Sequence, residues 1–242
     1  MSQSSMSTIA TVDDIRNIFI DDLANERFVV DKTGCKMLEI LAASFLADED
    51  AIFGTVNWDY VTREIEWYES MSLDVNAIPG GPPKVWQSVS DADGMINSNY
   101  GWCVWHGDNG HQYANVVKEL KSNPWSRRAV MIYTRPSMWV DYNVMGRSDF
   151  MCTNAVQYLI RDDRLHAVVQ MRSNDIWAGY RNDRAWQQYL LVKLASELGY
   201  EPGHIYWNAG SLHCYQKDFW MIDGFSKTGK MLTKKEYEQL NK

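Results

Sequence analysis

A cysteine, an arginine and an aspartate follow one another along residues 148–183 in an order that could serve covalent chemistry. Cys152 comes first, Arg172 lies near the middle and Asp183 comes at the end. A thiol beside a fixed positive charge is stabilised as the thiolate, which is the nucleophilic form. A carboxyl group can read the edge of a base through hydrogen bonds. Taken singly, these residues also have ordinary explanations, because a lone cysteine is usually a small buried hydrophobe and an aspartate before a helix usually caps it.

Charged residues elsewhere in the chain offer a phosphate clamp and a second acid. Arg127 and Arg128 are adjacent and follow Pro124, where a helix over 109–121 is expected to end. Two neighbouring arginines bind phosphate strongly, although a solvated basic pair is an equally ordinary interpretation. Glu64 lies among charged neighbours on an expected helix, where exposure to solvent is the default. The residues alone leave these interpretations open.

Composition and charge restrict the class of protein. Hydrophobic residues make up 45% of the 242 residues and charged residues 23%, as in ordinary globular domains. The net charge of −7 argues against a protein that coats nucleic acid, but allows an anionic small molecule held by clustered arginines. The sequence shows no secretory leader, no apolar run long enough to span a bilayer and no CxxC spacing among its four cysteines. We therefore expect a soluble cytoplasmic protein with reduced thiols, without direct binding to nucleic acid or membrane.

Local patterns predict a mixture of helices and strands without a regular βαβ alternation. A capping box at Thr11 and Asp14 begins the first helix, and Asn57 can cap the helix that carries Glu64. The other expected elements are a helix over 109–121, a strand over 129–135, a hairpin of 155–161 and 165–172 turning at Asp162-Asp163, and a helix from about Arg184 to Leu198 closed by Gly199. We expect residues 1–10 to be flexible and residues 11–242 to form one α+β domain.

Considered together, the candidate residues resemble the motifs of the thymidylate synthase family, from about residue 32 to residue 215. The family signature Arg-Ser-x-Asp-x-x-x-Gly-x-x-x-Asn is met from Arg172 onward, except that Asp183 occupies the final position. The positions that match the family's site are Lys32, Glu64, Trp86, Tyr100, Arg127, Arg128, Cys152, Arg172, Ser173, Asp175, Gly179, His213 and Tyr215. The resemblance implies a single-domain α+β fold with a large bent mixed sheet flanked by helices, and a homodimer that forms through one face of that sheet.

The resemblance also implies roles for these residues. Cys152 would be the nucleophile, and the other members of the catalytic set would be Glu64, Tyr100, Arg172 and Asp183. The groups that would bind the nucleotide are Lys32, Arg127, Arg128, Arg172, Ser173, Asn174, Asp183, His213 and Tyr215, with Arg127 and Arg128 reaching into the partner subunit's site. Those that would bind the co-substrate 5,10-methylenetetrahydrofolate are Glu64, Trp86, Asp175 and Gly179. No metal is implied.

Departures from a true thymidylate synthase point to one branch of the family. Thr153 follows Cys152 where histidine is usual, Ser211 replaces an aspartate near the sugar-binding His213, and the C-terminal tail that closes over folate is not recognisable. With Asp183, these changes make the chain similar to the bacteriophage deoxycytidylate hydroxymethylases. The similarity implies transfer of a hydroxymethyl group to dCMP, and it allows association with a phage complex for nucleotide-precursor synthesis.

Asp183 determines which base is expected. Uracil offers a donor at ring nitrogen 3 and an acceptor at position 4, and an asparagine amide complements this edge. Cytosine offers an acceptor at ring nitrogen 3 and an amino donor at position 4, and a carboxyl group complements this edge. The prediction depends on the register, because Asn182 would favour uracil in this place, but the position of Gly179 fixes the spacing on Asp183. The alternatives left open are a dUMP or CMP hydroxymethylase, a dCMP methyltransferase, and a silent nucleotide-binding subunit.

Overall fold

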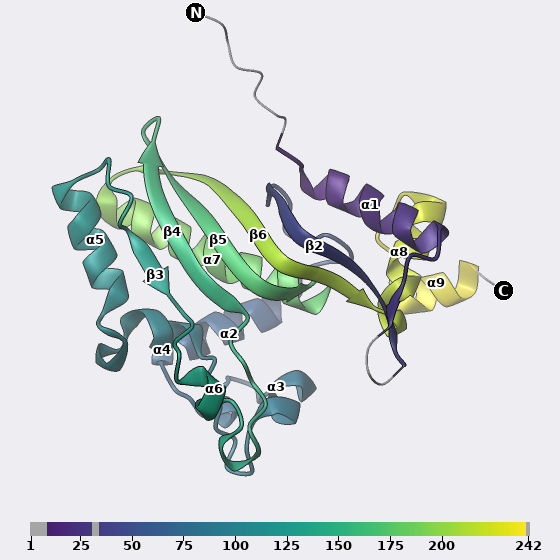
Figure 1. Ribbon diagram of the computed structural model, residues 1–242, viewed down its shortest axis with the longest axis horizontal. Coiled ribbons are helices and arrows are strands. Elements are labelled where there is room, and N and C mark those ends of the chain that lie inside the picture. The colour runs from purple at the N-terminus through teal and green to yellow at the C-terminus, as the bar shows by residue number, and fades with distance from the viewer. Residues whose placement is uncertain (1–8, 31–33, 241–242) are drawn as a thin grey trace, which may run out of the picture.

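A six-stranded mixed sheet forms the centre of the protein. The computed structural model describes residues 9–30 and 34–240, and Figure 1 looks onto the sheet. In spatial order the strands are β1 (Val29–Val30), β2 (Lys36–Leu46), β6 (Glu201–Tyr215), β5 (Arg164–Asp175), β4 (Thr153–Arg161) and β3 (Val130–Ile132). Strands β5 and β6 run parallel, and the other neighbouring strands are antiparallel. With the helices that flank this sheet, the expected α+β class is confirmed.

One βαβ unit brings the ends of neighbouring strands to the same edge of the sheet. Helix α7 (Ala178–Leu198) leads from the end of β5 back to the start of β6, so that Val169 lies opposite Trp207 in parallel strands. A parallel pair requires such a crossover, which the sequence patterns do not reveal. The carboxyl ends of β5 and β6 therefore lie together, beside the beginning of the antiparallel strand β4. Cys152, Arg172 and His213 all belong to this edge.

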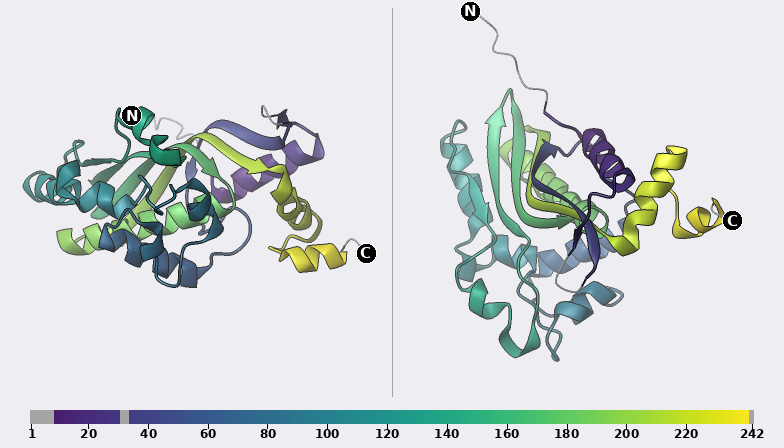
Figure 2. Two further views of the ribbon diagram at one scale, coloured as in Figure 1. Left: turned by 90° about the horizontal axis from the view of Figure 1, so that it is seen from below. Right: turned by 45° about the vertical axis from the view of Figure 1, so that its right-hand side comes forward.

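Side chains on the central strands alternate between a face covered by a helix and an open face. On β5, Leu165, Ala167 and Val169 are buried, whereas His166 and Val168 point to the other face. Figures 1 and 2 show α7 behind the sheet, with the front of β4, β5 and β6 uncovered by the helices of the described chain. The remaining α-helices are α1 (Val12–Ala24), α2 (Trp58–Ser70), α3 (Lys84–Val89), α4 (Tyr100–Trp105), α5 (Gln112–Ser122), α6 (Met138–Asp141), α8 (Phe219–Thr228) and α9 (Lys234–Leu240).

Most of the predicted helix ends and turns are confirmed. Thr11 caps α1 with both bonds of a capping box, and Asn57 caps α2. Gly199 ends α7 in the left-handed region, at φ 77°. The hairpin between β4 and β5 turns at Asp162 and Asp163, which both have positive φ. These features are local, so short stretches of sequence were enough to predict them.

Several boundaries differ from those expected. Helix α7 begins at Ala178, well before the expected start at Arg184, and the strand expected over 129–135 is the shorter β3. The flexibility predicted for residues 1–10 falls mostly outside the described residues and stays a prediction, as does the division of the chain into one domain. Among the helices of the described residues, none is both long and apolar enough to cross a membrane.

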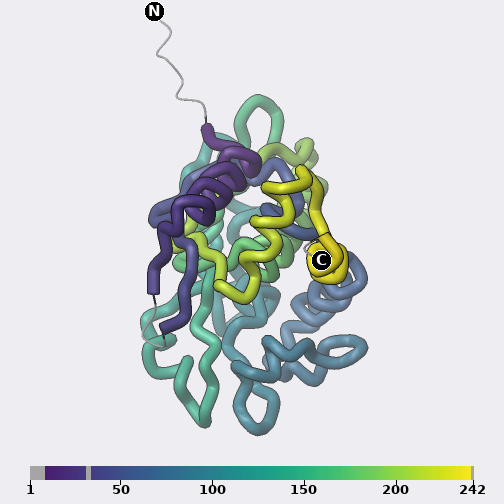
Figure 3. The backbone as a smooth tube through the Cα atoms, turned by 90° about the vertical axis from the view of Figure 1, so that its right-hand side faces the viewer, coloured from purple at the N-terminus to yellow at the C-terminus, as the bar shows by residue number. Residues whose placement is uncertain are grey.

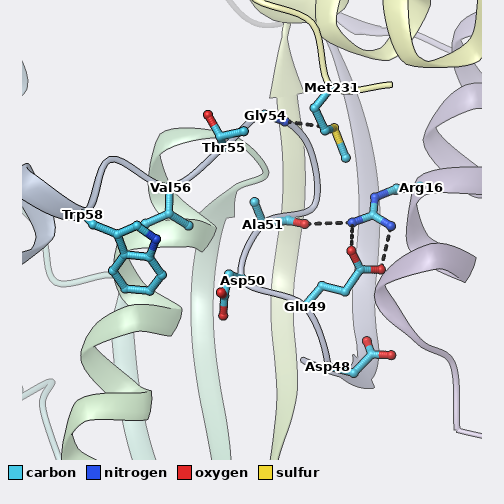
Figure 4. A pocket seen from close by; sticks show the side chains of 10 residues that line it. All are labelled: Arg16, Asp48, Glu49, Asp50, Ala51, Gly54, Thr55, Val56, Trp58 and Met231. Atoms are coloured by element: carbon cyan, nitrogen blue, oxygen red, sulfur yellow. Dashed lines mark hydrogen bonds and ion pairs between the residues drawn. The ribbon is translucent and has the colours of Figure 1, made fainter. Parts of the chain in front are cut away.

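Elements from both ends of the chain pack together beside β2. Figure 3 shows α1 and α8 side by side, and the Arg16 guanidinium lies 5.7 Å from the centre of the Phe225 ring. A cavity of about 490 Å³ opens between α1, the segment after β2 and Met231 (Figure 4). Arg16 donates to the Glu49 carboxylate (2.7 Å) and to the Ala51 carbonyl (2.9 Å), so these charges join the segment to α1. The lining of this cavity includes none of the predicted site residues.

Candidate active site

Cys152 and Arg172 lie side by side where β4 begins. The Arg172 backbone N–H donates to the Cys152 carbonyl oxygen (2.9 Å), and the Arg172 Nη2 is 3.6 Å from the Cys152 Sγ. Two backbone carbonyls hold the guanidinium, because Nε donates to Met151 (2.8 Å) and Nη2 to Phe150 (2.7 Å). The guanidinium carbon also lies 5.0 Å from the centre of the Phe150 ring. The structure thus brings together the predicted nucleophile and its predicted cation.

The Cys152 thiol is neutral at neutral pH in the field of the protein itself. Burial raises its pKa to about 11, and the negative charges of Asp183 and Asp149 add to the increase. Arg172 lowers the pKa, as the sequence predicts, but burial outweighs this effect. The thiol therefore has to lose its proton before it can add to a substrate.

Two donors hold Asp183 near the start of α7. The Tyr100 hydroxyl donates to Oδ1 (3.1 Å), and the Asn174 Nδ2 donates to Oδ2 (2.8 Å). The Tyr100 oxygen in turn accepts a hydrogen bond from the Thr153 Oγ1 (3.0 Å). Burial raises the pKa of Asp183 to about 7, and the negative charge of Glu64 contributes to the increase. Asp183 can therefore act either as a neutral acid or as an anion near neutral pH.

Asp183 is not a helix cap, which was the ordinary interpretation of its position in the sequence. Trp177 occupies the N-cap position of α7 and the helix begins at Ala178, so Asp183 lies inside the helix. Consecutive residues on an α-helix point about 100° apart. Because Asp183 faces Tyr100, Asn182 points in a different direction. This geometry supports the register in which Asp183 belongs to the site.

Glu64 is buried against two aromatic side chains, and it is not the solvated surface residue that its neighbours in the sequence indicate. The Tyr60 hydroxyl and the Trp86 Nε1 (3.0 Å) both donate to the Glu64 Oε1, and the Trp86 Nε1 is also 3.0 Å from the Tyr60 oxygen. Burial raises the pKa of Glu64, and the two donors oppose this increase. The sequence prediction missed Tyr60. Its spacing of four residues from Glu64 places both on one face of α2, which is the signal that could have identified it.

Gly179 leaves room for the contact between Asn174 and Asp183. A Cβ atom at Gly179 would lie 3.2 Å from the Asn174 Nδ2 and 3.3 Å from the Asp175 Cβ, which is tighter than ordinary van der Waals contact. Asp175 helps to turn the chain into α7 by accepting the backbone N–H of Trp177 (2.6 Å). The predicted signature is therefore one continuous piece of structure, formed by the end of β5 and the first turns of α7.

The end of β6 carries the predicted sugar-binding residues. The parallel register pairs Ser173 with Ser211, and the nearby His213 ring lies 5.0 Å from the Tyr215 ring. Burial lowers the pKa of His213, which favours the neutral imidazole. The Ser211 Oγ donates to the carboxylate of Glu39 on β2, a residue that the sequence did not indicate. This edge therefore offers hydroxyl, imidazole and phenol groups beside the end of β5.

Arg127 and Arg128 do not join the site within one chain. The Gln157 Nε2 on β4 donates to the Arg127 carbonyl oxygen (2.7 Å). Gln157 lies five positions along the chain from Cys152, a separation of roughly 16 Å in an extended strand. The Arg128 side chain is 79% exposed. Lys32, the other predicted phosphate ligand, lies outside the described residues.

The half-buried Cys152 thiol, the buried Glu64, the half-buried Asp183 and the polar strand edge form a set of groups that could serve covalent chemistry on a small molecule. Comparison with known proteins identifies the class. The model of the thymidylate synthase family matches residues 26–239, so the chain belongs to this family.

The relatives differ in how similar they are to the chain. The deoxycytidylate 5-hydroxymethyltransferase of Enterobacteria phage T4 is 54% identical over 240 residues, which cover 96% of this chain and 98% of the relative. The phage T2 protein of the same name is 53% identical with the same coverage. The thymidylate synthase of Bacillus subtilis subsp. natto is 26% identical and covers 84% of this chain and 77% of its own length. Among solved structures, the thermostable thymidylate synthase A from Bacillus subtilis has a TM-score of 0.67 at 24% identity, covering 89% of this chain and 82% of that one, and therefore shares the fold.

Proposed function

We infer that the chain is a deoxycytidylate 5-hydroxymethyltransferase, which converts dCMP, 5,10-methylenetetrahydrofolate and water into 5-hydroxymethyl-dCMP and tetrahydrofolate. The identity of 54% over nearly the full length of the phage T4 protein supports this activity. The observation that carries the choice of substrate is the Asp183 carboxyl, held by Tyr100 and Asn174 where the family signature has asparagine. Because these relatives are phage proteins, we propose that the enzyme acts in the cytoplasm of an infected host cell.

Asp183 complements cytosine through a proton that it shares with the base. The amino group at position 4 donates to one carboxyl oxygen, and a proton on the other oxygen satisfies ring nitrogen 3. Uracil would bring its own N–H against that proton and leave a buried polar edge mismatched. We therefore expect a strong preference for dCMP over dUMP.

Cys152 begins the reaction by adding to ring carbon 6 after its thiol proton leaves to solvent. As the sulfur–carbon bond forms, the electrons of the 5,6 double bond move between carbons 4 and 5, and the electrons of the 3,4 double bond move onto nitrogen 3. Nitrogen 3 then takes the proton of Asp183, which becomes a carboxylate. Carbon 5 is now nucleophilic and can take up a one-carbon unit.

The folate co-substrate supplies that one-carbon unit, and the residues at the predicted positions suit it. Trp86 offers an indole wall for a flat ring, and Asp175 offers a carboxylate to ring N–H and amino donors. Both side chains are half-buried. Because Tyr60 and Trp86 bind the Glu64 Oε1, we assign Oε2 to the water that completes the hydroxymethyl group. Carbon 5 bonds to the one-carbon unit, and loss of the carbon 5 proton with departure of tetrahydrofolate would leave an exocyclic methylene. Glu64 would accept a proton from the water as the water oxygen bonds to this carbon, and the electrons of the exocyclic double bond return to the bond between carbons 4 and 5. Asp183 then takes back the proton of nitrogen 3, the 5,6 double bond forms again, and the bond from carbon 6 to Cys152 breaks to release the product.

We further propose that two copies of the chain associate through the open face of the sheet. Ile132, Val168 and Tyr206 give this face an apolar character, and a sheet face of this kind is usually covered. Arg127 and Arg128 lie far from the nucleophile of their own chain, so a second copy would bring them to the nucleotide phosphate of the first. A cluster of arginines suits a monophosphate far better than a free nucleoside.

The test offers dCMP, dUMP and CMP separately, each tritiated at carbon 5, with methylenetetrahydrofolate. Tritium release and product mass are measured, and we expect release from dCMP with gain of one hydroxymethyl group. Release from dUMP alone would refute the assignment of Asp183, and release from CMP would identify a ribonucleotide enzyme. A methyl product formed with dihydrofolate would refute water addition, whereas no release from any nucleotide would favour a silent binding subunit.

A further inference from the structure

Both carboxylate oxygens of Asp183 already face donors that belong to the protein. The Tyr100 hydroxyl donates to Oδ1 (3.1 Å) and the Asn174 amide donates to Oδ2 (2.8 Å). Asn174 is only 2% exposed, and its Oδ1 is buried without a hydrogen-bond partner among the described residues. The amide is therefore turned so that its donor, and not its acceptor, meets Asp183.

Thr153 sets the direction of the other donor. Its side chain is fully buried, and its Oγ1 donates to the Tyr100 oxygen (3.0 Å). The Thr153 hydroxyl also lies 3.3 Å from the Met171 sulfur, which is a weak acceptor compared with a phenol oxygen. Because the Tyr100 oxygen accepts from Thr153, the Tyr100 hydrogen is directed at Asp183. Thr153 stands directly after the nucleophile, where the family usually has histidine.

The hydrogen bonds from Tyr100 and Asn174 restrict the directions in which the hydrogen of a neutral Asp183 carboxyl can point. A hydroxyl hydrogen on the carboxyl cannot be directed at the Asn174 amide hydrogens or at the Tyr100 hydrogen, since donor would then face donor. We propose that Thr153 and Asn174 are positioning residues that determine base specificity, because they direct the proton of a neutral Asp183 outward to the base. Asp183 then presents one donor and one acceptor, as cytosine requires. This inference rests on the proposed function and deepens it.

The charges around Asp183 agree with a role for its neutral form. Burial and the charge of Glu64 on α2 raise the pKa of Asp183 to about 7, and Asp175 on β5 adds to the increase. Tyr100 on α4 and Asn174 on β5 oppose it through their hydrogen bonds. Loss of either donor should therefore raise the pKa of Asp183 further, while releasing the proton from its fixed direction. A role in packing alone would predict neither effect.

The experiment compares Thr153→Val and Asn174→Leu, which keep the side-chain shape and remove one donor each. The specificity constant kcat/KM is measured for dCMP and dUMP across the pH range. For each variant we expect the ratio of dCMP to dUMP to fall at least tenfold, and the alkaline limb of the dCMP profile to move to higher pH. Thr153→Ser, which restores the hydroxyl, should recover most of the ratio. Thr134→Val is the matched control, because its hydroxyl donates to the Asn154 carbonyl and, among the described residues, not to Tyr100 or Asp183.

An unchanged ratio of dCMP to dUMP would overturn the inference. If the ratio is unchanged because kcat/KM falls equally for both nucleotides, these side chains act in packing. If one of the two variants does not fold, the other still tests the inference, because each variant removes a different donor from the hydrogen-bond network around Asp183. Failure of the proposed function is distinguishable, since the unsubstituted enzyme would then not turn over dCMP at all.

Discussion

Replacing Asp183 by asparagine should exchange a preference for cytosine for a preference for uracil. The substituted amide has one acceptor and one donor group, which is the complement of the uracil edge. It must still fit between Tyr100 and Asn174, which both donate to the carboxylate in the unsubstituted protein. The oxygen of the substituted amide can keep the hydrogen bond from Asn174, and its nitrogen can donate to the Tyr100 oxygen, which has a second lone pair beside the one that accepts from Thr153.

The expected size follows from the number of hydrogen bonds that change. Two bonds to cytosine, at ring nitrogen 3 and at the amino group, become mismatched. Each mismatched buried polar group costs about 1–3 kcal/mol, so the two together cost about 2–6 kcal/mol in kcat/KM for dCMP. At about 1.4 kcal/mol for each factor of ten, this corresponds to a loss of roughly 30-fold to 20,000-fold.

The assay is tritium release from carbon 5 of dCMP and dUMP, measured on the unsubstituted enzyme, Asp183→Asn and the neighbouring control Asn182→Ala. The control should leave the preference unchanged, because Asn182 points about 100° around α7 from Asp183. The reasoning would be refuted if Asp183→Asn kept its ratio of dCMP to dUMP within threefold of the unsubstituted enzyme. A change of base produced by the control would assign the register to Asn182 instead.

Four further outcomes are expected. The rate of alkylation of Cys152 by iodoacetamide should rise tenfold for each pH unit up to near pH 11, and a plateau near pH 7 would contradict the neutral thiol. A mixture of Arg127→Ala and Cys152→Ala proteins, each inactive, should regain activity after subunit exchange; no recovery would argue against a shared site. Tyr60→Phe should lower kcat about tenfold with little change in the KM for dCMP, because it removes a donor to Glu64. The control is Tyr113→Phe, which removes a hydroxyl that donates to Glu197 (2.9 Å). The pKa of Asp183 is raised from 3.8 to about 7 in the folded protein, so between these values the folded protein binds more protons than the unfolded chain. The free energy of unfolding should therefore fall as the pH rises from 4 to 7, and Asp183→Asn should reduce this slope.

Local chemistry explains which parts of the fold were predictable. The caps at Thr11 and Asn57 and the helix end at Gly199 depend on a few adjacent residues, and the structure has them as predicted. The long strands β2 and β6 escaped prediction. In β2 the positive φ of Ala42 interrupts the pairing with β6, so the alternation of apolar and polar residues that marks a strand is broken.

The sequence by itself determined the signature that ends at Asp183 and the family to which the chain belongs, and it predicted Cys152 as the nucleophile. The residues from Arg172 to Asp183 are close in sequence, so a strand end and a helix start keep them close in space. Only the tertiary structure decided that Glu64 is buried, that the Cys152 thiol is neutral, and that Asp183 receives hydrogen bonds from both sides. The reason is physical: burial and hydrogen bonds between distant segments arise when β4, β5, α4 and α7 pack together, and no local pattern encodes the electrostatic field that this packing creates.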